Sequence, residues 1–165
     1  MTNTIQDYLR HIARRSVRVQ DRMNKYIHHE KNELSDGELK KIRIKHIGDY
    51  QGYKFYYVNG EYIRDNVDID FCLGGSYSRY KYIPENDFWL EHTAEKGDIA
   101  PTILHEYIEC GKMVKDEWIY DKAHDFASKY EKAFRKVYKP SKDIFQDFIK
   151  EYERIHGSKL EGTSC

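Results

Sequence analysis

Three residues in the C-terminal half of the chain have the types and the spacing of a metal site. His105, Glu106 and Glu109 form an H-E-x-x-E pattern inside the segment 103–109, which reads as helix. Because residues four apart lie on one face of a helix, His105 and Glu109 could hold one divalent cation, with Glu106 beside it as a base. We therefore predict a metal site here, with Glu106 as the general base.

A third protein ligand is expected, because two seldom hold a catalytic zinc. His124 and Glu131 lie seven residues apart in the next predicted helix, at the edge of its apolar stripe. The short connection over 114–118 predicts an antiparallel helical hairpin that returns this edge toward His105 and Glu109. We predict that His105, Glu109 and His124 bind zinc, with Glu131 as the second choice or as a partner of a ligand.

A helical wheel places His105 and Glu109 on one arc of their helix and most of its apolar residues on the opposite arc. The pattern therefore predicts a helix anchored by its apolar face, with the H-E-x-x-E face free. An ordinary solvated face of charged residues is the alternative interpretation. The presence of Thr102 and Met113 on the free arc, where a surface helix would carry longer charged side chains, favours the site.

The elements that position these residues follow from changes in hydrophobic periodicity. Residues 1–36 read as an N-terminal helix, and residues 38–93 alternate with the period of an antiparallel sheet. Within this sheet, Asn59-Gly60 predicts a hairpin, and strands are expected over 53–58, 67–71, 77–83 and 88–91. Helices are predicted over 100–115, 119–138 and 141–155. The order predicts an α+β fold with an antiparallel β-meander in a single domain, residues 1–156, whose helical part is 99–156. Residues 157–165 are predicted to form a flexible tail after this domain.

The segment from Asn66 to Glu131 resembles known proteins in several motifs. LHEYIE, followed by AHDFASKYE, is similar to the helix pair of zincin-type metallopeptidases. Together with NVDIDF and IPENDFWLE, it resembles a group of small phage and prokaryotic proteins with an H-E-x-x-E motif. The resemblance covers less than half of the chain. It implies His105, Glu109 and His124 as ligands. Zincins have histidine where Glu109 stands, and an anionic ligand at this position would make the metal a weaker Lewis acid.

The residue types then predict a mechanism, peptide hydrolysis by a metal-activated water that Glu106 deprotonates. Tyr120 and Tyr130 are both candidates for stabilising the oxyanion. By analogy with zincins, the strand over 88–91 would align an extended peptide. A site that only binds metal, in a regulatory role, is left open.

A non-enzymatic binding protein is the rival interpretation. A cationic ridge at the N-terminus could engage an acidic protein or a nucleic acid, and it comprises Arg10, Arg14, Arg15, Arg18 and Arg22. A tyrosine-rich sheet could likewise bind a protein. The alternative for the ridge is a solvated helix face.

The composition of the whole chain limits the remaining classes. Lys plus Arg and Asp plus Glu both total 28, so the net charge does not indicate a nucleic-acid or membrane partner. No apolar run is long enough to span a membrane, and we expect a cytoplasmic protein. The isolated Cys72, Cys110 and Cys165 disfavour a disulfide framework.

Overall fold

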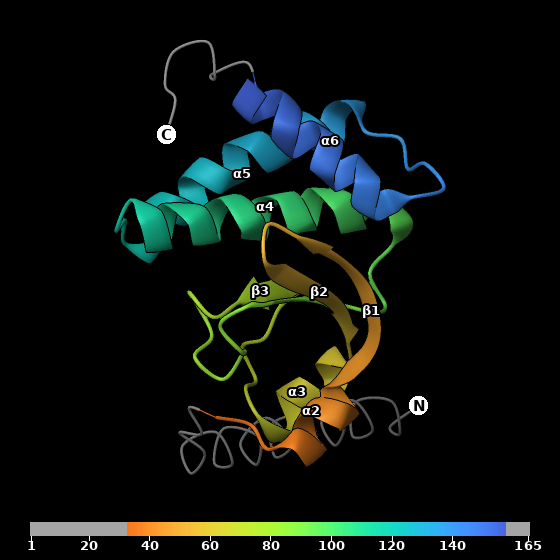
Figure 1. The fold of residues 1–165 in the computed structure, drawn as a ribbon, viewed down its shortest axis with the longest axis vertical. Coiled ribbons are helices and arrows are strands. Elements are labelled where there is room, and N and C mark those ends of the chain that lie inside the picture. The colour runs from red at the N-terminus through yellow and green to blue at the C-terminus, as the bar shows by residue number, and fades with distance from the viewer. Residues whose placement is uncertain (1–32, 158–165) are drawn as a thin grey trace, which may run out of the picture.

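The fold combines helices with one small sheet, which confirms the α+β class. The computed structural model describes residues 33–157. Its helices are α2 (Asp36–Ile42), α3 (Gly60–Asn66), α4 (Lys96–Lys115), α5 (Tyr120–Val137) and α6 (Ile144–Gly157), and its strands are β1 (Arg43–Tyr50), β2 (Tyr53–Val58), β3 (Gly74–Ser76) and β4 (Asp87–Glu91). In Figure 1, α5 and α6 form one layer, α4 the next, the sheet a third, and α2 and α3 lie beyond it. Within the described range, no helix has the length and apolar character needed to cross a bilayer.

The predicted antiparallel meander is wrong in its connectivity. The strand order is β1-β2-β4-β3, and β2 and β4 are parallel, whereas the two outer pairs are antiparallel. The hairpin between β1 and β2 turns at Gln51 and Gly52, which both have positive φ angles, as a tight hairpin turn requires. The strand over 88–91 is confirmed within β4, which lies in the interior of the sheet.

Asn59-Gly60 does not form the predicted hairpin. The Asn59 side chain instead accepts a hydrogen bond from the Tyr62 backbone N–H at 2.9 Å and caps helix α3. Asparagine favours both turns and helix N-caps, because its short side chain can bond to nearby backbone groups. The chain therefore leaves β2 through a helix and returns to pair with β2 in parallel.

The strands predicted over 67–71 and 77–83 are also wrong, since both segments form turns. Asp68 Oδ1 accepts a hydrogen bond from the Asp70 backbone N–H at 2.9 Å, which bends the first segment. In the second, the Tyr80 N–H donates to the Ser76 carbonyl at 2.9 Å. Only the short strand β3 lies between them, and it forms one edge of the described sheet.

The first described helix begins where the N-terminal helix was predicted to end. Ser35 and Glu38 form a reciprocal capping box that starts α2, in which the Ser35 side chain accepts from the Glu38 N–H and the Glu38 carboxylate accepts from the Ser35 N–H. Residues 36–42 are therefore helical instead of opening the sheet. The rest of the predicted N-terminal helix, and the tail beyond Gly157, fall outside the described residues.

Helix α4 occupies the centre of the molecule, between the sheet and the pair α5 and α6 (Figure 1). Its apolar residues join one core with the sheet and both outer helices, through contacts that include Phe55 and Phe88 from the sheet and Phe148 from α6. The three C-terminal helices lie close to their predicted ranges, and the predicted hairpin of α4 and α5 is confirmed. A helix enclosed in this way has side chains covered in nearly every direction.

The opposite face of the sheet covers a second core that contains two buried carboxylates of β4. Asp87 Oδ2 accepts from Arg43 Nε at 2.9 Å and from Trp89 Nε1 at 3.0 Å. Glu91 lies 3.1 Å from Arg64 Nη2 and accepts a hydrogen bond from the Gly60 N–H at 3.3 Å. Burial acts to raise the pKa of Glu91, but these donors outweigh it and hold that pKa below its usual value.

Candidate metal centre

The three residues predicted as ligands lie together between α4 and α5. Glu109 Oε2 is 3.3 Å from His105 Nε2 and 2.9 Å from His124 Nδ1. The two imidazole nitrogens are 3.1 Å apart. The atoms therefore form a compact triangle, with two corners on α4 and one on α5.

The size of this triangle suits a tetrahedral zinc ion. Zinc bonds of about 2.0–2.1 Å to nitrogen and oxygen separate the ligands of a tetrahedron by about 3.3–3.4 Å. One side of the triangle, at 3.3 Å, matches that separation, and the other two, at 3.1 and 2.9 Å, are slightly shorter. Among the described residues, this is the group of His, Cys, Asp and Glu side chains whose ligand atoms converge closely enough to hold an ion. A small outward movement of side-chain atoms would admit one.

The H-E-x-x-E face is buried, and the prediction of a free face is wrong. His105 is 6% exposed and Glu109 is 2% exposed, because α5 covers the arc that the wheel left open. His124 closes the group from α5, where the buried Ala123 and Ala127 take up little space between the helices. The His124 side chain remains 43% exposed, so the triangle is reached from that side.

Glu131 holds the outer nitrogen of His105. Its Oε2 lies 2.8 Å from His105 Nδ1, which is close enough for an ion pair although the angle is unfavourable for a hydrogen bond. Such a carboxylate keeps a proton on Nδ1 and leaves Nε2, the nitrogen in the triangle, available to a metal. Glu131 Oε1 in turn accepts from Arg135 Nε at 2.9 Å, and Arg135 also pairs with Asp98. The position of Glu131 fits the second role predicted for it, that of a partner of a ligand.

The carboxylates around His105 strongly favour its protonated form in the absence of a metal. Burial acts to lower the pKa of His105, but Glu109 and Glu131 outweigh it and raise that pKa to about 10. Glu131 responds in the opposite sense, because His105 and Arg135 hold its pKa below the usual range despite burial. The group as a whole thus has acceptors in excess and attracts positive charge.

Glu106 points from α4 toward the sheet. Its Cγ lies so close to β3 that a Cβ added at Gly74 would meet it at 3.3 Å. Oε2 is fully covered and has no hydrogen-bond partner among residues 33–157. Burial, and then the charge of Glu109, raise the pKa of Glu106 to about 8. Within this range Glu106 makes no hydrogen bond to the three ligand atoms, so it is adjacent to the triangle in sequence without being part of it.

Two further side chains reach the open side of the triangle. The Tyr120 hydroxyl is 3.3 Å from His124 Nδ1. The guanidinium carbon of Arg79 lies 4.1 Å from the centre of the Tyr120 ring, and its charge opposes the rise in the pKa of Tyr120 that burial and Glu109 cause. Tyr130, the other tyrosine considered for the oxyanion, instead packs on Phe126 at 5.1 Å. Of the two tyrosines, Tyr120 is the one at the site.

Arg79 could not be identified from the sequence. It lies in a turn between β3 and β4 that was predicted as a strand, and no motif surrounds it. The cationic ridge Arg10 to Arg22 lies outside the described residues and stays a prediction. The tyrosines predicted to cover the sheet are half-buried or buried, and they comprise Tyr53, Tyr56, Tyr57, Tyr77, Tyr80 and Tyr82.

The chain matches no protein-family profile, no curated protein sequence and no solved structure. The function is therefore inferred from the geometry and chemistry of the site.

Proposed function

We propose that the protein is a zinc-dependent hydrolase of peptide bonds, in which His105, Glu109 and His124 bind the metal. One observation carries the proposal, namely the convergence of three ligand atoms from two helices at separations near those of a tetrahedral ion. The residue types agree, since imidazole nitrogen and carboxylate oxygen are both zinc ligands.

The substituted ligand in H-E-x-x-E does not change the composition of the site. Two histidines and one glutamate also hold zinc in catalytic sites such as that of thermolysin. Here Glu109 occupies the last position of the motif on α4, where the familiar motif has its second histidine ligand. The second histidine of this site, His124, comes from α5. The ligand set keeps one carboxylate, so the charge it places on the metal equals that of the familiar site.

A buried network of ion pairs without a metal is the competing interpretation. In such a network, we expect each carboxylate to meet a donor of its own, because unpaired charge is costly to bury. At this site Glu109 Oε2 meets both imidazoles, but three carboxylates, Glu106, Glu109 and Glu131, surround His105, and Glu106 Oε2 is covered without a hydrogen-bond partner among residues 33–157. The excess of acceptors supports a cation as the missing component.

The residues around the triangle suit hydrolysis. A bound zinc ion supplies Lewis acidity, which polarises a carbonyl and lowers the pKa of a bound water. Glu106 would accept the proton of the attacking water and pass it to the leaving amine, which requires its side chain to turn from the sheet toward the triangle and to be ionised there, since burial raises its pKa to about 8. Tyr120 donates a hydrogen bond from its hydroxyl to the developing oxyanion, and Arg79 adds positive charge beside the Tyr120 ring.

An extended peptide, the proposed substrate, would have to pair with a sheet edge whose three residues are buried within the described chain. The predicted alignment strand over 88–91 is interior, so it cannot serve. Strand β3 is the edge strand on that side of the described sheet, and its Gly74 packs directly on Thr102 and Glu106 of α4. An edge strand can pair with an extended peptide through its backbone. In zincins, which this chain resembles, the peptide lies in this manner beside the metal helix.

Metal analysis tests the proposal first. Protein purified without chelator or nickel resin should contain about one zinc per chain, in line with one three-ligand site. His105→Ala should lose the metal, whereas Glu106→Gln should keep it. Saturating zinc should raise the melting temperature of the wild type and of Glu106→Gln, and not that of His105→Ala.

Peptide hydrolysis is tested separately, with a library of quenched fluorescent peptides. The zinc-loaded wild type should cleave members of the library, and Glu106→Gln should lose about a hundredfold or more of that rate while it retains zinc. Absence of bound zinc, and of any thermal shift on adding zinc, would refute the metal site. Bound zinc without cleavage by the wild type would refute the hydrolase and leave the metal site standing.

A further inference from the structure

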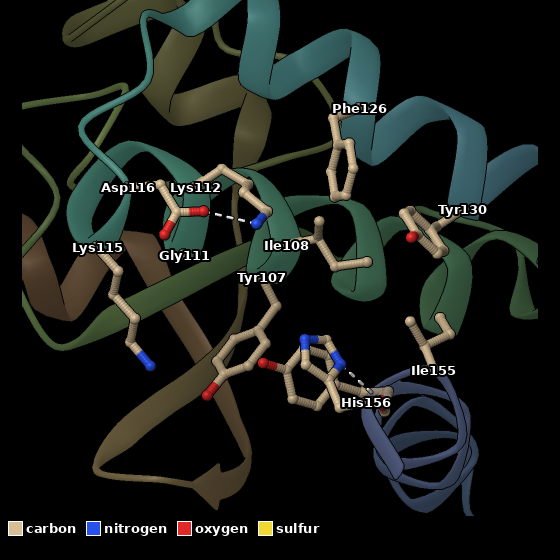
Figure 2. A pocket seen from close by; sticks show the side chains of 11 residues that line it. Tyr107, Ile108, Gly111, Lys112, Lys115, Asp116, Phe126, Tyr130, Ile155 and His156 are labelled. Carbon is tan, nitrogen blue, oxygen red and sulfur yellow. Dashed lines mark hydrogen bonds and ion pairs between the residues drawn. The ribbon is translucent and has the colours of Figure 1, made fainter. Parts of the chain in front are cut away.

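A pocket lies on a neighbouring face of α4 and contains none of the metal ligands. It has a volume of about 230 Å³ and opens where α4, α5 and α6 meet (Figure 2). Tyr107, Ile108 and Gly111 form its α4 wall. At about 100° per residue, Tyr107 and Gly111 lie about 120–160° around the helix from His105 and Glu109, and Ile108 lies about 60–100° from them. The pocket is therefore separate from the proposed catalytic site.

Aromatic rings from the three helices form the walls. Tyr107 meets Tyr152 edge to face, with ring centres 4.8 Å apart, and Phe126 contacts Tyr130 with centres 5.1 Å apart. Ile155 completes the apolar lining from α6. Figure 2 shows Tyr107 and Ile108 from α4, Phe126 and Tyr130 from α5, and Ile155 from α6 gathered at this junction of the three helices. Because the rings hold one another, the pocket is formed before any ligand arrives.

Gly111 keeps the pocket open. It lies inside the 20-residue helix α4, where glycine is less favourable than alanine. Apart from Gly111 itself, its two neighbours and the nearby backbone of α4, no described atom lies within 4 Å of the position that a Cβ on Gly111 would take, so packing within the described chain does not require a glycine. The missing side chain leaves space that a bound molecule can use.

The mouth of the pocket carries a net positive charge. Lys112 and Lys115 lie there with a single carboxylate, Asp116, whose Oδ2 is 2.6 Å from Lys112 Nζ. Lys115 is exposed and has no ion pair within residues 33–157. His156 stacks on Tyr152 at 4.0 Å and uses Nδ1 to bond to the Tyr152 carbonyl. One ammonium group is therefore available to an anion.

We propose that this pocket binds a small aromatic carboxylate, with the ring between Tyr107, Phe126 and Tyr130 and the carboxylate at Lys115. The pocket volume of about 230 Å³ suits a ligand with a single ring and a short acidic side chain. An uncharged ring would use the same walls and lose the contact with the ammonium group. The site is independent of the proposed hydrolase.

Calorimetric titration with hydrocinnamate tests the proposal, and its amide, hydrocinnamamide, serves as the uncharged control. The full chain should bind the acid with a Kd of about 1 mM or tighter, and the amide at least fivefold more weakly. Gly111→Leu, which fills the pocket with a better helix former, should abolish binding of both. Lys115→Met should bring the acid down to the affinity of the amide. His105→Ala, on the neighbouring face of α4, should bind like the wild type.

Three results would overturn the proposal. One is the absence of hydrocinnamate binding to the full chain. Another is equal binding by the wild type and Gly111→Leu, provided that the circular dichroism spectrum of the variant shows it to be folded. The third is binding that emerges only when residues 158–165 are removed, which would assign the pocket to the chain's own C-terminal residues. Failure of zinc binding at His105 would not affect any of these measurements.

Discussion

Two groups of buried carboxylates lie on opposite faces of the sheet, and they are balanced in different ways. Around Glu91, the neighbours are donors, with Arg64 at 3.1 Å and the Gly60 N–H at 3.3 Å. Around Glu109, the neighbours are imidazoles and further carboxylates, and Glu106 Oε2 has no hydrogen-bond partner in the described range. In the first group Arg64 lies 3.1 Å from Glu91 Oε2 and balances its charge, although that oxygen makes no hydrogen bond in the described range. In the second group Glu106 Oε2 has neither an ion pair nor a hydrogen bond among residues 33–157, which leaves room for a positive charge from outside.

The difference separates a structural role from a binding role. A buried charge that is fully paired contributes to holding the fold, and removing its partner is strongly destabilising. A buried group with excess acceptors costs stability in the absence of its ligand, and such a cost is typical of functional sites. The two groups should therefore respond in opposite ways to loss of a carboxylate charge.

The largest effect on folding is expected at Glu91. Glu91→Gln leaves Arg64 without its charge partner and should lower the free energy of unfolding by about 2 kcal/mol, below the full cost of a buried pair because Arg64 is 34% exposed. Urea denaturation of the metal-free protein measures this change. The exposed Glu85, changed to Gln, is the matched control and should stay within about 0.5 kcal/mol of the wild type. A similarly small effect at Glu91 would contradict its structural role.

Zinc affinity should depend on Glu131 and not on Glu91. Glu131→Gln weakens the hold on His105 Nδ1, and loss of such a supporting partner typically costs about 10–100-fold in metal affinity. Competition with a chromophoric chelator measures the affinity. Asp125→Asn, an exposed change on the same helix, should leave it unaltered, and so should Glu91→Gln. If Glu131→Gln and Asp125→Asn bound zinc equally, the contact between Glu131 and His105 would have no part in metal binding.

The stability of the Glu91 group should also depend on pH in a defined direction. Because the folded-state pKa of Glu91 is lowered, its contribution is present above the unfolded value of about 4.3 and is lost as the pH falls through the folded value. The wild type should therefore lose more stability than Glu91→Gln as the pH falls below about 5. Urea unfolding curves at several acidic pH values give this difference. Parallel pH profiles for the two proteins would exclude the shifted carboxyl.

The smallest effect on folding is expected at Glu106. Glu106→Gln removes no hydrogen bond from Oε2, and because the raised pKa of about 8 leaves the carboxyl mostly neutral near pH 7, metal-free stability should stay within about 1 kcal/mol of the wild type. Thermal unfolding in the presence of a chelator measures it. A loss comparable to that of Glu91→Gln would show that Glu106 is a structural residue like Glu91, and the contrast between the two groups would disappear.

The helical half of the fold was predictable because its signals are local. The apolar stripes of α4, α5 and α6 give their approximate ranges, and the short link between α4 and α5 brings His124 to His105 and Glu109. The burial of that face was not predictable, since it depends on what α5 covers. The capping box of Ser35 and Glu38 was a readable signal for α2 that the prediction missed.

The sheet was predicted poorly because its pairings are not local. Parallel pairing of β2 with β4 leaves no sequence signature. The Asn59-Gly60 pair is equally compatible with a hairpin turn and with the helix N-cap that Asn59 forms here. The alternating pattern of 67–71 also fits a turn in which Asp68 bonds to the backbone of Asp70. Arg79 reaches Tyr120 only through these turns, so no part of the sequence identifies it as a neighbour of the site.

The interior place of β4 has a consequence for the order in which the chain assembles. Strands β1 and β2 can pair early, since a two-residue turn joins them, but β4 must first cross residues 59–86 to reach β2. Closing such a loop is slow relative to local pairing, so we expect this step to limit the folding rate. Helix α4 follows directly after β4 in the chain, and it gains its support only when the sheet is complete. In a refolding experiment, the ability to capture zinc should therefore emerge last, after the helical signal has been recovered.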